Sequence, residues 1–160
     1  MLISAKEADW TREAVARFWT LSRQLLNSIR RYQSAGSLGR KRAVLSHRFW
    51  SVVTGADIPI NTQIGGGLIL PHPNGIVIHP QSQIGPNCIV FQQVTLGVNR
   101  GQKGAPVIGG HVDIGPGARI LGPVRIGDHA VIGANAVVLS DVPEGATAVG
   151  VPARILPQRG

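Results

Sequence analysis

The feature that most constrains this chain is an apolar repeat with a period of six residues, which begins near residue 58. A glycine directly follows many of the repeating aliphatic residues, and a second small or medium apolar residue follows most of them after four positions. The longest unbroken series is Ile108, Ile114, Ile120, Ile126, Ile132 and Val138. A period of six matches neither the 3.6 of an α-helix nor the 2.0 of an ordinary strand. The region therefore needs an architecture built from hexapeptides.

A coil satisfies this pattern if each hexapeptide forms one short flat side and one corner. Three hexapeptides then close a triangular turn, and successive turns stack with their strands about 4.8 Å apart. The aliphatic residue points into the prism and meets its equivalents from the neighbouring coils. Repeats of this length are typical of parallel β-helices. We therefore predict a mainly β protein with a β-helix over residues 56–160.

Two interruptions of the repeat mark places where chemistry can be added to the scaffold. At the first, eight residues rather than six separate successive aliphatic positions, and the added segment 71–75 contains His72. At the second, the spacing is twelve, and the polar, glycine-rich segment 98–106 contains Arg100 and Lys103. We interpret the second segment as a loop that leaves the prism.

The N-terminal part of the chain is different in character. Residues 1–50 hold ten Lys and Arg against three acidic residues, a net charge of +7, whereas the whole chain carries +8. Apolar residues spaced by three and four predict helices at about 7–33 and 40–53, which make residues 1–55 a basic α-helical segment. Two interpretations remain open: the helices cover the end of the domain or an oligomer contact, or they bind an anionic membrane surface.

Composition excludes several other classes. The chain of 160 residues is the size of one domain, and we find neither an apolar run of the roughly 20 residues that span a membrane nor a signal peptide, so a cytoplasmic location is expected. The basic residues do not form a patch with stacking aromatics, so nucleic acid is not an expected partner. Cys88 is the only cysteine and fits a small core position. His111 and His129 are one coil apart on outward corners, but no third ligand is spaced to join them, so no metal is expected.

Four motifs then carry a family resemblance: PHPNGIVI, FQQVTLG, IGPGARILGPVRIGDHAVIGANAVVLSDVP and the closing GVPARIL. Together, over about residues 56–156, they resemble the hexapeptide acyltransferases of the left-handed β-helix superfamily. Within it they are most similar to the serine O-acetyltransferase branch and its sugar-acetylating relatives. The resemblance implies a left-handed coil, a homotrimer with active sites in the clefts between prisms, and acetyl-CoA as the acetyl donor.

The same resemblance assigns roles to individual residues. His72 stands where the family has its catalytic histidine, a general base suited to taking the acceptor's hydroxyl proton near neutral pH. Asp57, fifteen residues earlier, matches the acidic residue that pairs with this histidine and orients it. By motif position the Ala134 amide matches a contact to pantetheine. The matching position one coil earlier is Pro116, which has no N–H, so this contact is expected to shift to Gly117.

For the nucleotide phosphates of the donor we select three basic residues: Arg119, Arg154 and Lys103. The acceptor side departs from serine acetyltransferases, because Pro71, Gly104 and Ala105 stand where the family has an aspartate, an arginine and a histidine. A zwitterionic amino acid left without charged partners would be costly to bind. We therefore expect a saccharide hydroxyl as acceptor, held by uncharged side chains: Asn74, Gln92, Gln93 and Asn99. The alternatives are a serine O-acetyltransferase and a non-catalytic scaffold.

Overall fold

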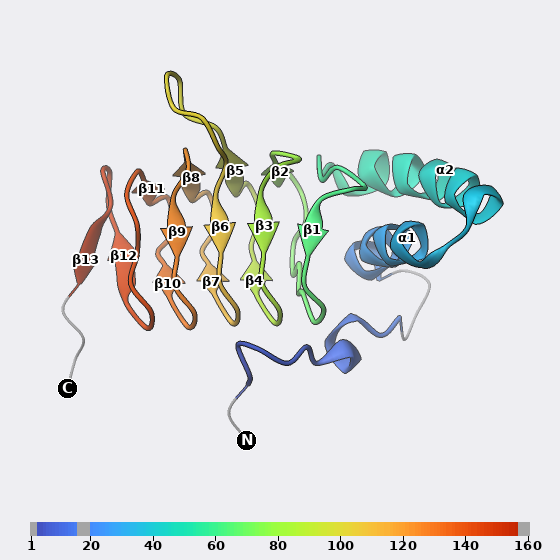
Figure 1. The fold of residues 1–160 in the computed structure, drawn as a ribbon, viewed down its shortest axis with the longest axis horizontal. Coiled ribbons are helices and arrows are strands. Elements are labelled where there is room, and N and C mark those ends of the chain that lie inside the picture. Colours follow the sequence, from blue (N-terminus) through green and yellow to red (C-terminus); the bar gives the residue numbers. More distant parts are fainter. Residues whose placement is uncertain (1–2, 16–19, 157–160) are drawn as a thin grey trace.

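The structure is a computed structural model that describes residues 3–15 and 20–156. After a 3₁₀ turn, η1 (Trp10–Glu13), the chain forms two α-helices, α1 (Leu21–Ser34) and α2 (Ser37–Thr54). Short strands then wind into a prism, with the helices at its N-terminal end and a loop projecting from its side (Figure 1). The first bridge of the prism is at Asp57, so the change from helices to coils falls at residues 55–56.

Three sheets form the faces of the prism, and the middle coils each add one strand to every sheet. Face A consists of β2 (Val77–Ile78), β5 (Thr95–Gly97), β8 (Arg119–Leu121) and β11 (Val137–Val138). Face B consists of β1 (Gln63–Ile64), β3 (Gln83–Ile84), β6 (Val107–Ile108) and β9 (Arg125–Ile126). Face C consists of β4 (Ile89–Val90), β7 (Asp113–Ile114), β10 (Val131–Ile132), β12 (Thr147–Val149) and β13 (Arg154–Leu156). The strand pairs are parallel except β12 with β13.

The register of these pairs follows the spacing of the sequence. Thr95 lies beside Val77, eighteen residues earlier, which is three hexapeptides. The offset becomes twenty between β1 and β3 and twenty-four between β3 and β6. The larger offsets are the two interruptions of the repeat, so the added residues leave the strands in register and extend only the corners.

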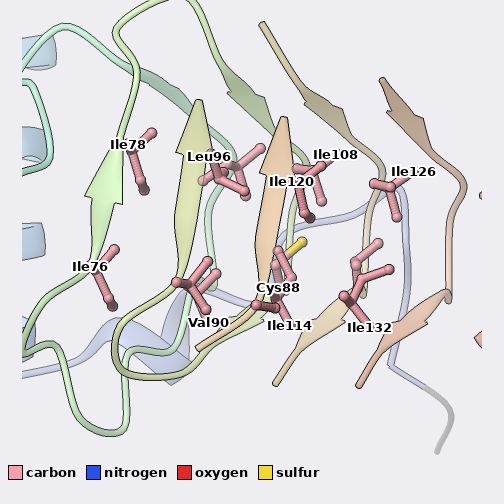
Figure 2. Packing of buried hydrophobic residues seen from close by; sticks show 14 of the residues in the cluster. Ile76, Ile78, Cys88, Val90, Leu96, Ile108, Ile114, Ile120, Ile126 and Ile132 are labelled. Carbon is pink, nitrogen blue, oxygen red and sulfur yellow. The ribbon is translucent and has the colours of Figure 1, made fainter. Parts of the chain in front are cut away.

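The core is a set of aliphatic columns inside the prism. One inward residue from each face lies above its equivalent in the neighbouring coil, as Leu96 and Ile120 do on face A and Ile114 and Ile132 on face C (Figure 2). All four are fully buried. Burying such a side chain stabilises the fold by roughly 1.5–3 kcal/mol. A period of six places one in each flat side, which is why the pattern specifies this fold.

The chain passes from one face to the next at three corners. The first corner, from face A to face B, includes residues 98–106. The second corner, from face B to face C, is formed by residues 65–68, 85–88, 109–112 and 127–130. The third corner, from face C to face A, is formed by residues 70–76, 91–94, 115–118 and 133–136.

The expected helix at 7–33 is wrong in its N-terminal half. Apart from the turn η1, residues 3–13 form an irregular segment with bends at residues 5–7, the N-terminal strap, and α1 begins only at Leu21. Residues 16–19 lie outside the described part of the chain. Local side chains account for the difference. Ser4 Oγ accepts hydrogen bonds from the amides of Lys6 and Glu7, and the Asp9 carboxylate accepts one from the amide of Thr11. Such side-chain bonds compete with helix formation.

The strap lies along the second corner. The Asn87 side chain donates to the carbonyls of Ser4 and Glu7 and accepts from the amide of Asp9. Lys6 forms an ion pair with Asp128, two coils further on. The strap therefore ties separate coils together along the outside of the prism.

The second predicted helix, at about 40–53, is confirmed as α2. Its C-terminal cap is Gly55, with φ of 65°, a left-handed conformation that favours glycine. α1 buries Leu25, Leu26 and Ile29 in the common core. Among the described residues, no helix has the length and hydropathy needed to cross a membrane.

Candidate active site

The turn that carries His72 lies at the third corner, against the end of α2. The amide of Gly75 donates to the carbonyl of Gly55 at 2.8 Å. A Cβ on Gly55 would lie 2.7 Å from Asn74 Nδ2, so the helix cap and the turn are in close contact. The first interruption of the repeat is therefore anchored on the helices, with the His72 side chain exposed.

Asp57 lies next to this turn, at the N-terminal edge of face A. Its amide donates to the carbonyl of Ile76 at 2.8 Å, and its carbonyl accepts from the amide of Ile78 at 2.9 Å. The structure thus brings Asp57 and the His72 turn to one place. Within the described part of the chain the Asp57 and His72 side chains form no hydrogen bond with each other.

Two proposed donor contacts, Gly117 and Ala134, are also at the third corner, on later coils. The Gly117 N–H already donates to the carbonyl of Gln92 at 2.9 Å, so it is not free for a ligand. The Ala134 N–H has no hydrogen-bond partner among the described residues, and the residue is exposed. The corner therefore offers one free amide on the coil of Ala134, and Pro116 offers none on the coil before it.

The three basic residues selected for the donor phosphates are dispersed. Arg119 is on face A beside the third corner, and its Nη1 donates to the carbonyl of Gly117 at 3.3 Å. Arg154 begins β13 on face C. Lys103 is exposed on the loop 98–106, at the first corner.

The four residues expected to bind the acceptor lie at two different corners. Asn74, Gln92 and Gln93 lie at the third corner, and the amide of Gln93 donates to the carbonyl of Asn74 at 3.0 Å. The Oε1 atom of Gln92 is buried and has no hydrogen-bond partner within the described structure. Asn99 is on the loop at the first corner.

The loop and the His72 turn are on opposite edges of face A. The loop leaves the prism after β5 and returns at β6, whereas the turn leads into β2 (Figure 1). The loop's base packs against the next coil, where a Cβ on Gly104 would lie 2.9 Å from Pro123 Cβ. Because face A separates the two corners, one prism does not combine them into a single site.

The other residues discussed in the sequence analysis, His111, His129 and Cys88, lie away from the third corner. His111 and His129 meet edge to face at the second corner, with their Nδ1 atoms 2.9 Å apart. No three His, Cys, Asp or Glu side chains in the described chain group as metal ligands. Cys88 is fully buried, and burial raises the pKa of its thiol to about 11.

Sequence reasoning missed the way α2 supports this site. His47 of α2 is buried and contacts Ser28 of α1 and Ser51 of α2. Burial lowers the pKa of His47, while a hydrogen bond with the backbone of Ile58 and the charge of Asp57 act in the opposite direction. The signal in the sequence was the helix stop at Gly55, two residues before Asp57.

Comparison with known proteins identifies similar chains. Residues 105–140 match the family model for the bacterial transferase hexapeptide (six repeats). The chain is 38% identical over 131 residues to the serine acetyltransferase of Helicobacter pylori strain J99, covering 78% of this chain and 77% of that one. It is 38% identical over 119 residues to the serine acetyltransferase of Synechococcus elongatus, covering 73% of this chain and 48% of that one. The chain therefore spans about half the length of some relatives and most of others.

A solved structure shows the same fold. A serine acetyltransferase in complex with CoA is 36% identical, superposes with a TM-score of 0.74, and is matched over 87% of this chain and 58% of that chain. These similarities confirm the prediction of a left-handed β-helix acyltransferase preceded by a short helical segment.

The same comparisons show that the expected saccharide acceptor is wrong, because the relatives are serine acetyltransferases. That expectation depended on three positions, Pro71, Gly104 and Ala105, which lack charge in this chain. Two of the three are on the loop side of face A, away from His72. The residue types at those three positions therefore do not identify the groups that contact the acceptor.

Proposed function

Because the chain belongs to the serine acetyltransferase family of hexapeptide-repeat transferases, we propose that it transfers the acetyl group of acetyl-CoA to the hydroxyl of serine. The observation that carries the proposal is the third corner, where the His72 turn and the free Ala134 amide lie along one edge of the prism. A histidine supplies the base, and a free backbone amide is a contact for the amide-rich arm of the donor.

In this mechanism His72 takes the proton from the serine hydroxyl as its oxygen attacks the thioester carbonyl. The new C–O bond forms, the C–S bond breaks, and the proton passes from the imidazolium to the departing thiolate. Asp57 orients the ring and stabilises its charged form once the two side chains meet. A positioned general base contributes about 10²–10⁴ to the rate.

Serine binding needs partners for an ammonium group and a carboxylate. At the third corner the Gln92 Oε1 atom has no hydrogen-bond partner in the described structure, and it would accept from the ammonium group once the side chain turns toward the ligand. Cations for the carboxylate and for the donor phosphates are present on the loop, at Arg100 and Lys103. We propose that these come from the loop of a neighbouring prism in a homotrimer, since face A separates the loop from His72 within one chain.

Two histidine variants and one aspartate variant test the proposed function. His72→Ala should reduce the serine-dependent release of CoA by about 10²–10⁴, with acetyl-CoA affinity unchanged. Asp57→Asn should lose less, because Asp57 orients rather than reacts. His129→Ala is the matched control, an exposed histidine at another corner, and should keep full activity. A fully active His72→Ala protein would refute the mechanism, and a wild-type protein that binds no acetyl-CoA would identify a scaffold.

The trimer is tested by light scattering together with activity. We expect a mass three times that of the chain. A monomer that still acetylates serine would show that one prism is sufficient, contrary to the shared site.

We also propose that the helices bind an anionic membrane surface at its cytoplasmic side. Neither α1 nor α2 contains an acidic residue. Exposed apolar residues form one stripe along α2: Leu38, Leu45, Phe49 and Val52. Basic residues lie on both sides of it: Lys41, Arg42 and Arg48. Such a stripe suits an interfacial helix. Leu45→Ser should abolish co-sedimentation with phosphatidylserine vesicles; loss of the trimer in this variant would instead assign the stripe to a second copy.

A further inference from the structure

The third corner of the prism holds its coils together through one left-handed residue in each coil. Gln93 and Gly117 have φ of 58° and 72°. The amide of Gln93 donates to the carbonyl of Asn74 at 3.0 Å, and the amide of Gly117 donates to the carbonyl of Gln92 at 2.9 Å. In both cases the acceptor directly precedes the left-handed residue of the coil before. These backbone bonds therefore stack the turns of the corner in register.

At the N-terminal end of this stack, a helix takes the place of a coil. Gly75 is the left-handed residue of the His72 turn, with φ of 71°. The described chain before Asp57 forms helices, so no earlier coil lies beneath the turn. Instead the Gly75 amide donates at 2.8 Å to the carbonyl of Gly55, the C-terminal cap of α2. The helix cap thus supplies the acceptor that a coil supplies elsewhere.

The segment that carries His72 has little conformational freedom of its own. A proline precedes the histidine at position 71, and another follows it at position 73. Each proline ring fixes its own φ, and Pro73 also restricts the backbone of His72. The location of the histidine therefore depends on the base of the turn. On the helix side, the hydrogen bond from Gly75 to Gly55 holds that base.

Gly55 belongs to both elements through its backbone. Its amide donates to the carbonyl of Val52 at 3.3 Å within α2, while its carbonyl accepts from the amide of Gly75. With φ of 65° and ψ of 26°, the residue is in the left-handed conformation. Residues with a Cβ avoid this conformation, asparagine least and β-branched residues most. A residue that leaves it would turn the carbonyl away from Gly75.

We propose that Gly55 is a positioning residue for the reaction: its left-handed conformation directs its carbonyl at the Gly75 amide and so fixes the His72 turn against the end of α2. This inference rests on the proposed acetyl transfer, in which His72 takes the serine proton. A general base must lie within hydrogen-bond reach of that proton, and a misplacement of about 1 Å can lower the rate about 100-fold. The helices thus have a part in the reaction besides covering the end of the prism.

Three substitutions separate the conformation of Gly55 from the size of a side chain there. Gly55→Asn adds a larger side chain that tolerates the left-handed region, Gly55→Ala adds the smallest side chain, and Gly55→Val adds one that strongly avoids this region. A Cβ at this position would also lie 2.7 Å from Asn74 Nδ2, so all three are compared again in an Asn74→Ala background. Gly145→Val is the matched control, because Gly145 has φ of 66° but bonds to Asp128 at the second corner.

We expect kcat for serine acetylation to follow tolerance of the left-handed conformation. It should stay within about threefold of wild type in Gly55→Asn, fall about tenfold in Gly55→Ala and fall by up to about 100-fold in Gly55→Val. The KM for acetyl-CoA should change less than about twofold, because the Ala134 amide is on a later coil. Gly145→Val should lower the melting temperature and leave kcat unchanged.

Two results would overturn the inference. Losses that follow side-chain size and disappear in the Asn74→Ala background would assign the effect to the contact with Asn74. A lowered melting temperature with unchanged kcat in every Gly55 variant would show a cap that serves stability alone. Where Gly55→Val does not fold, the order of Gly55→Asn and Gly55→Ala makes the same distinction.

A second measurement does not depend on activity. Hydrogen exchange of the Gly75 amide reports its bond to Gly55 directly. Exchange should be about tenfold faster in Gly55→Val than in wild type, as the loss of one hydrogen bond allows, and unchanged in Gly145→Val. Unchanged exchange in Gly55→Val would refute the positioning role. If the wild-type protein acetylates no serine, the proposed function fails, and Gly75 exchange still decides whether the cap holds the turn.

Discussion

The ion pair between Glu13 and Arg30 should be the contact whose loss most destabilises the N-terminal part of the fold. Arg30 of α1 binds both carboxylate oxygens of Glu13, with Nε 2.9 Å from Oε2 and Nη2 2.8 Å from Oε1. The same guanidinium donates to the carbonyls of Ile64 and Gly65 at 2.6 and 2.7 Å, and Oε1 of Glu13 accepts from the amide of Leu68 at 3.0 Å. The strap, α1 and the first coil therefore meet at one buried group of charges.

The perturbation is Glu13→Ala, and burial sets its magnitude. The side chains are only 8% exposed for Glu13 and 16% for Arg30, so this pair is not a surface salt bridge. Removing one partner of a buried pair costs about 3–5 kcal/mol, because the other charge remains desolvated. Arg30 retains two carbonyl acceptors, which favours the lower end, about 3 kcal/mol. Glu13→Gln keeps an acceptor for Leu68 and should cost less, about 1–2 kcal/mol.

Urea unfolding at fixed protein concentration measures these losses, because assembly makes stability depend on concentration. For an m-value of about 2 kcal/mol/M, Glu13→Ala should lower the midpoint by about 1.5 M. A double variant, Glu13→Ala with Arg30→Met, should recover part of the loss, since it leaves no unpaired charge. A loss below about 1 kcal/mol in Glu13→Ala would refute the reasoning, since that is the range of an exposed pair.

Further outcomes concern the donor, the thiol and the strap. Pro116→Ala adds an N–H one coil before the free amide of Ala134, so the KM for acetyl-CoA should fall about two- to tenfold, as one added hydrogen bond allows; an unchanged KM would place the donor elsewhere. Cys88, whose pKa is raised to about 11 by burial, should not react with a disulfide reagent at pH 8 until the protein unfolds, and rapid labelling of the native protein would contradict this. The hydrogen bond from Lys6 lowers the pKa of Asp128, so its contribution to stability is present above the unfolded value of about 3.9 and is lost as the pH falls through the folded value. The difference in Tm between wild type and Lys6→Met should therefore vanish in acid, and a difference that persists there would exclude this ion pair as its source.

The hexapeptide pattern allowed the prism to be predicted, because every flat side repeats the same inward residue. Even the two larger offsets between strands follow from the spacing at 71–75 and 98–106. The arrangement around His72 could be predicted less well from the sequence. The hydrogen bond between Gly75 of the His72 turn and Gly55 joins backbone atoms of residues twenty positions apart, and residue types do not encode such a contact directly.

The N-terminal strap shows why local patterns failed in that segment. Apolar spacing from Trp10 onward fits a helix, but Ser4 and Asp9 bond to nearby amides instead. The partner that holds the strap, Asn87, sits at a corner with φ of 61°, where asparagine is common for its backbone alone. Nothing in the sequence marks its side chain as the acceptor and donor for a segment some eighty residues away.

The strap also changes how the prism is expected to come apart. A stack of repeats resembles a one-dimensional chain in which each unit feels only its neighbours, so its ends can fray one unit at a time. Here residues 4–13 contact coils from Leu68 to Asp128, and so they couple units that do not touch. Loss of the first coil must then also release contacts further along, which turns independent fraying at the N-terminal end into a concerted step. The strap thus extends cooperative unfolding from the first coil to the coil of Asp128.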